Sequence, residues 1–97
     1  MNLQEKIDNT EEYGTLVLDF NEYVGFIVID KPITIDGRES TICAKHGPVL
    51  SVHSEGVSLK NLRLEVTSDV KGGEGALALL IKEGLSADLE KVEVRGN

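Results

Sequence analysis

Two stretches of eight residues, 30 positions apart, share one pattern of apolar and polar side chains and align without a gap. They are residues 57–64 (VSLKNLRL) and residues 87–94 (ADLEKVEV), and in both the apolar side chains occupy the first, third, sixth and eighth places. A looser copy begins at Ile33 and returns to an apolar residue at Ile42. A repeat of this length predicts stacked structural units, because one unit cannot bury its apolar side chains alone.

Each copy of the repeat contains three short strands. A longer apolar strand precedes each copy, at residues 26–29, 49–52 and 77–81, and a turn then leads to two short strands separated by a two-residue corner. Three strands per repeat with tight corners predict an all-β fold, a three-sided right-handed parallel β-helix of about three coils. We expect a single domain over residues 1–97, with the coils in residues 15–97.

A short polar stretch precedes the first strand. Within residues 2–12, Leu3 and Ile7 are four positions apart, which places them on one face of a helix, and Gly14 ends the pattern. This spacing predicts a short α-helix that caps the N-terminal coil.

Residues 3–42 resemble the opening of the pectin-lyase-like parallel β-helix proteins. In that superfamily an amphipathic helix leads to a strand ending in I-x-K-P-I-T-I-x-G, and here residues 29–37 read IDKPITIDG. Residues 56–65 (GVSLKNLRLE) resemble the recurring G-V-x-I-x-N-L-x-I. The likeness is greatest to the branch with the nitrous-oxide-reductase accessory type and related carbohydrate-binding and sugar-hydrolase domains. The resemblance implies a β-helix over nearly the whole chain, and it implies no particular activity, because that architecture serves unrelated functions.

The chain is acidic, with a formal net charge of −7. Such a surface repels phosphate backbones and anionic lipids, so we expect neither nucleic acid nor a membrane as partner. No signal-like or membrane-length apolar run is present, which predicts a cytoplasmic protein as given, and a secreted or periplasmic one if a signal peptide has been removed. Cys43 is the single cysteine, which excludes an internal disulfide.

Groups suited to catalysis or metal binding are sparse. Alignment of the longer strands puts Asp30, His53 and Lys82 in one column, where an acid, an imidazole and an amine could exchange protons. The alternative, which we favour, is a solvated ladder of charges at the strand ends. Cys43, His46 and His53 follow no spacing rule of zinc sites, so we expect no metal and no cofactor and assign no catalytic residue.

One face of the longer strands is predicted to be apolar and exposed. If Ile27 and Ile29 point inward, then Phe26 and Val28 point outward. The matching outward residues of the next coils are Val49, Ser51, Ala78 and Leu80. An exposed apolar stripe marks a contact site, unless the inward phase is off by one or residues 68–75 cover the stripe. The candidate binding residues are Phe26, Val28, Val49, Leu80, Asp30, His53 and Lys82.

The last coil is predicted to lack a cap, because the chain reads only Arg-Gly-Asn after Val94. Open strand edges pair readily with other chains, so either the natural protein continues past Asn97 or this end docks against a partner or a second copy. The leading hypothesis is a non-catalytic interaction module that uses this edge. The alternative is the N-terminal part of a protein that binds or cleaves polysaccharide, and a third hypothesis is a self-assembling structural unit. The aromatic residues, on which a sugar ring stacks, fall near the first coil: Tyr13, Phe20, Tyr23 and Phe26.

Overall fold

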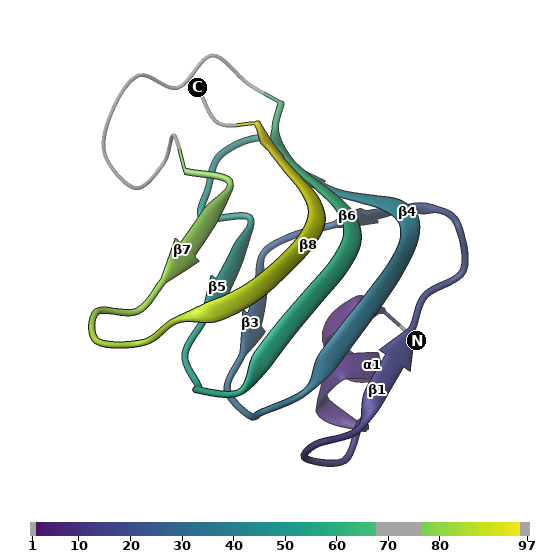
Figure 1. Ribbon diagram of the computed structural model, residues 1–97. Coiled ribbons are helices and arrows are strands. Elements are labelled where there is room, and N and C mark those ends of the chain that lie inside the picture. The colour runs from purple at the N-terminus through teal and green to yellow at the C-terminus, as the bar shows by residue number, and fades with distance from the viewer. Residues whose placement is uncertain (1, 68–76, 96–97) are drawn as a thin grey trace.

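The computed structural model describes residues 2–67 and 77–95, which form one short helix and two sheets of parallel strands (Figure 1). The elements are α1 (Leu3–Asp8), β1 (Thr15–Val17), β2 (Glu22–Val24), β3 (Ile27–Ile29), β4 (Thr34–Ala44), β5 (Leu50–Val52), β6 (Val57–Val66), β7 (Leu79–Ile81) and β8 (Ala87–Arg95). The large sheet has the order β1-β4-β6-β8, with β2 also paired to β4, and the small sheet has the order β3-β5-β7.

From β3 onward the chain alternates between the small and the large sheet, and each strand from β4 onward pairs with an earlier strand of its own sheet (Figure 1). The pairing of the two aligned stretches is confirmed: Val57 lies opposite Ala87, Leu59 opposite Leu89, and Leu64 opposite Val94. The equal spacing of apolar side chains fixes this register, because a slip of one residue would turn the apolar set away from the core.

The core lies between the two sheets. Alternate side chains of β4 and β6 point into it, and Ile35, Leu59 and Leu64 are completely buried. The small sheet contributes Ile29, Leu50 and Val52, which are also completely buried. Among the described residues, the buried polar side chains are those of Ser40 and Ser51. The Ser40 hydroxyl donates to Asp19 O at 2.9 Å and accepts from Asn21 N at 3.2 Å.

The prediction of a three-sided right-handed parallel β-helix of about three coils is wrong. The described strands form two sheets, because the second and third strands predicted for each repeat are one continuous strand, β4, β6 or β8. Residues with left-handed backbone form the corner within these strands: Arg38 (φ 50°) and Glu39 (φ 68°) in β4, Asn61 (φ 54°) in β6 and Lys91 (φ 53°) in β8. In β4 the corner contains extra residues, so the register with β6 shifts between Asp36 and Ser40.

The helix is shorter than the predicted residues 2–12, and it covers the first strand of the small sheet. Asn2 caps it by accepting a hydrogen bond from Glu5 N at 2.9 Å, and Leu3 and Ile7 are buried against the core. The side-chain amide of Gln4 bonds to the backbone of Val28 in both directions, donating to Val28 O at 2.9 Å and accepting from Val28 N at 2.8 Å. The free edge of β3 is therefore closed by a side chain that takes the place of a neighbouring strand.

Candidate functional site

The opposite end of the two sheets, formed by β7 and β8, is left uncovered by the described residues. We call it the β7/β8 end. Leu59 and Leu64 of β6 are fully buried, whereas their partners in register on β8, Leu89 and Val94, are 46% and 45% exposed. Since these side chains have the same inward orientation, the difference comes from the absence of a further strand over β8 among the described residues.

In the small sheet, too, the apolar side chains are less buried at this end. Leu50 and Val52 of β5 are completely buried, but Leu79 and Ile81, which pair with them on β7, are only partly buried. Among the strands that the structure describes, β7 and β8 are terminal in the order of their sheets, so each has a neighbouring strand on one side only. The β7/β8 end thus combines half-exposed apolar side chains with unpaired strand edges, the features that accept an additional strand.

The predicted apolar stripe is not continuous. Phe26 and Val28 are 53% and 40% exposed, and the Phe26 ring lies against His46 with 5.0 Å between ring centres. Val49 was expected to point outward, but it is completely buried, and Ser51, which pairs with Val28 and with Leu80, is also buried. Leu80 is partly buried at the centre of β7. The structure therefore separates the exposed aromatic pair near β3 from the apolar residues of β7.

Asp30, His53 and Lys82 lie at neighbouring positions just after β3, β5 and β7, and all three are exposed. The backbone ladder continues to this level, since His53 N donates to Ile29 O at 2.8 Å and Lys82 N donates to Val52 O at 3.0 Å. No hydrogen bond or ion pair between their side chains is formed in the described part of the chain. The column is therefore a set of solvated side chains at the strand ends.

Residues 2–67 and 77–95 contain no group of three or more His, Cys, Asp or Glu side chains placed to hold a metal ion. Cys43 is partly buried on β4, and burial, with Glu22 and Glu65 nearby, raises the pKa of its thiol. Within the same described ranges, no helix is long and apolar enough to cross a membrane.

A groove of about 670 Å³ lies on the outer face of the large sheet. Side chains from four strands stand in register along it: Glu22, Thr41, Arg63 and Glu93. Phe20, which is 77% exposed, also lines this groove. The groove therefore offers one exposed aromatic ring beside polar side chains that can donate and accept hydrogen bonds.

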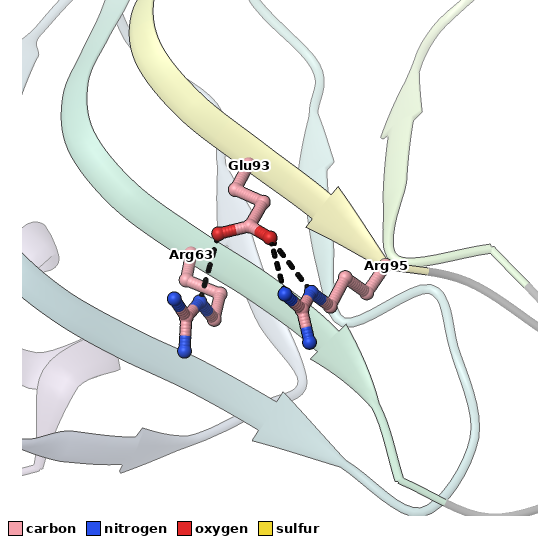
Figure 2. Close-up of polar contacts among 3 residues, drawn as sticks. All are labelled: Arg63, Glu93 and Arg95. Atoms are coloured by element: carbon pink, nitrogen blue, oxygen red, sulfur yellow. Dashed lines mark hydrogen bonds and ion pairs between the residues drawn. The ribbon is translucent and has the colours of Figure 1, made fainter.

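Arg63, Glu93 and Arg95 form a charged cluster on strands β6 and β8, and Arg63 and Glu93 also line this groove (Figure 2). The Glu93 carboxylate accepts from Arg63 Nε at 3.0 Å and from Arg95 Nε at 2.7 Å, so one acid bridges strands β6 and β8. These bonds, from Arg95 and then from Arg63, hold the pKa of Glu93 below its usual value. At the neighbouring corner, Asn61 Nδ2 and Arg38 N donate to Asp36 Oδ1, which lowers the pKa of Asp36 in the same way.

None of the predicted binding residues lines this groove, although the sequence contains a signal for it. Arg63 and Glu93 occupy the same place in the two aligned stretches and carry opposite charges, so the 30-residue offset already pairs them. Phe20 carries no comparable signal, because the turn that brings it beside the large sheet lies outside the repeat.

Comparison of the chain with protein-family models, with curated proteins and with solved structures found no match in any of the three.

Proposed function

We propose that this protein is a non-catalytic interaction module that binds a partner strand at the β7/β8 end. The observation that carries the proposal is the loss of burial between equivalent residues of adjacent strands, from 0% exposed at Leu59 to 46% at Leu89. An added strand would cover Leu89 and Val94 and pair the free edge of β8. Backbone hydrogen bonds would then supply affinity, and the alternating side chains would supply specificity.

The contrast between the two ends of the molecule supports this assignment. At β3 the helix α1 and the side-chain amide of Gln4 cover the outer edge of the strand. At β7 and β8 the described residues provide no such closure, and Leu89 and Val94 remain about half exposed. An edge left open beside a protected one is a typical site of strand addition.

A peptide with the sequence of residues 57–66 tests the proposal, because β8 already pairs with this sequence on its other side. We expect the fluorescently labelled peptide to bind the protein saturably, with a dissociation constant below about 1 mM, which corresponds to about 4 kcal/mol. Lys60 and Arg63 of the peptide would also face an acidic strand that contains Asp88, Glu90 and Glu93. Fluorescence anisotropy at low protein concentration measures the binding.

Two N-methylated peptides provide the control. Alternate amides of a strand point to opposite sides, so methylation of one alternate set blocks the bonds to β8 and methylation of the other set does not. One methylated peptide should lose binding and the other should keep it. The proposal would be contradicted if both methylated peptides bound saturably. It would also be contradicted if neither the parent peptide nor a methylated peptide bound.

The groove beside Phe20 favours a second candidate function, the binding of a neutral or weakly charged sugar. Sugar rings pack their apolar face on exposed aromatic rings while amides and charged groups bond the hydroxyls, and the groove supplies Phe20, Asn21, Asn61 and Arg63. The charged residues of the groove include acids and bases in similar number, Glu22, Glu39 and Glu93 against Arg63 and Lys91, so a polyanion gains little there.

A screen of neutral and acidic glycans tests this candidate. Any glycan that binds in the groove should bind about fivefold more weakly to the Phe20→Ala variant, since one stacked aromatic ring accounts for about 1 kcal/mol. The matched control is Tyr13→Ala, because Tyr13 is 84% exposed and does not line the groove. Failure of all glycans to bind, or equal weakening by both variants, would exclude the groove as a sugar site.

A further inference from the structure

The inward residues of β8 are placed symmetrically about its corner. Ala87 and Leu89 precede the corner, Val92 and Val94 follow it, and all four are at least partly exposed at the β7/β8 end. Between them lie Glu90 and Lys91, which are both exposed, and Lys91 makes the bend with its left-handed backbone (φ 53°). Read in either direction, the strand presents the same sequence of inward and outward side chains.

Because of this symmetry, β8 can pair antiparallel with β8 of a second copy of the chain. If the corners of two β8 strands coincide, Ala87 lies opposite Val94 of the second copy and Leu89 lies opposite Val92 of the second copy. Every inward apolar side chain then meets another inward apolar side chain. β7 obeys the same symmetry, because Leu79 and Ile81 lie on either side of Leu80 and all three are apolar and partly buried.

The charges at the corner distinguish β8 from the strand beneath it. In the antiparallel arrangement Glu90 of each chain lies opposite Lys91 of the second copy, which gives two attractive pairs. The corresponding residues of β6 are Lys60 and Asn61, which would form no such pair. Asp88 would lie opposite Glu93 of the second copy, and this repulsion is reduced because Arg63 and Arg95 already neutralise Glu93 (Figure 2).

Resting on the proposed function, we infer that the strand bound at the β7/β8 end is β8 of a second copy of this chain, paired antiparallel about a two-fold axis at the Glu90–Lys91 corner. Such an interface is isologous, so a single self-complementary strand is sufficient to build it. It covers Leu89 and Val94 of both chains and leaves the helix-covered ends facing outward. Because each chain has a net charge of −7, the dimer should be tighter at moderate salt than at very low salt.

Charge reversal at the corner tests the inference by sedimentation equilibrium. The native chain should form a dimer, and Glu90→Lys or Lys91→Glu alone should weaken it at least about tenfold, because two attractive cross-strand pairs become repulsive. An equimolar mixture of these two variants should associate as a heterodimer more tightly than either variant alone, since every corner pair is then of opposite charge. Folding effects cancel in this comparison, because the same two chains are measured alone and together.

Two further variants complete the test. The double variant Glu90→Lys/Lys91→Glu should dimerise like the native chain, and Glu12→Lys, which changes the net charge at an exposed site far from β8 in the sequence, should do so as well. A native chain that stays monomeric at millimolar concentration, or a mixture that associates no better than its components, would overturn the inference. In that event the proposed function still stands if the peptide of residues 57–66 binds with one set of amides, whereas failure of that peptide as well would remove both.

Discussion

Replacing Leu59 with alanine is expected to lower the free energy of unfolding by about 3 kcal/mol. Leu59 is completely buried between the two sheets, with β4 on one side of its strand and β8 on the other. Truncation of a leucine in such a position costs the transfer free energy of the lost carbons and leaves a cavity, which together amount to about 2–5 kcal/mol. Urea denaturation followed by circular dichroism measures the change, and it should leave the slope of the transition unaltered.

Leu89→Ala is the matched control, since Leu89 has the same side chain, the same orientation and the paired position on the next strand. Its side chain is 46% exposed, so its truncation should cost only about 1 kcal/mol. The measurement is made at the lowest protein concentration that gives a signal, so that association of strand edges does not contribute. Equal losses at Leu59 and Leu89 would show that β8 is covered in solution by a part of the chain itself, contrary to the open β7/β8 end.

A methyl group added at Gly37 is expected to cost about 3 kcal/mol, because no space is left for it. Gly37 is buried at the corner of β4, and a Cβ atom built there lies 2.7 Å from the carbonyl oxygen of Asn61 and 2.6 Å from Cγ of Leu62. The carbonyl belongs to the neighbouring strand and cannot move without breaking the register of β4 with β6. Gly37→Ala should therefore lower the midpoint of thermal and of urea unfolding together.

Gly84→Ala separates this steric effect from the general cost of losing a glycine. Gly84 has a left-handed backbone (φ 85°) and nothing lies within 4 Å of a Cβ built on it, so only the backbone penalty of about 1 kcal/mol applies. If Gly37→Ala proves no more destabilising than Gly84→Ala, then the corner of β4 is more open than its distances indicate.

The register of the strands was predictable from the sequence, and the number of sheets was not. Equal spacing of apolar residues in residues 57–64 and 87–94 determines which residues pair, because burial of one face allows no other alignment. The same pattern does not determine whether the chain ends one strand at a corner or bends through it. At Asn61 and Lys91 the backbone turns within a strand, and a single left-handed residue gives too weak a signal to distinguish these outcomes.

The site was predicted in part, for a related reason. The open β7/β8 edge follows from the repeat itself, since the last copy has no successor among the described strands. The exposed stripe was wrongly extended through Val49, because alternation assumes one buried face, whereas every residue of β5 is buried. The groove depends on Phe20, which reaches the sheet through an irregular segment between β1 and β2 that no periodic pattern describes.

The bond between Gln4 and Val28 has a consequence for how far association can proceed. A molecule with pairing edges at both ends would add copies without limit and form fibres. Here the side-chain amide of Gln4 occupies the backbone groups of β3, and the other outer strands, β1 and β2, are only three residues long each. If copies associate through the β7/β8 end as proposed, growth by edge pairing should therefore stop at the dimer, because α1 and Gln4 cover the edge of β3 at the other end of the described structure.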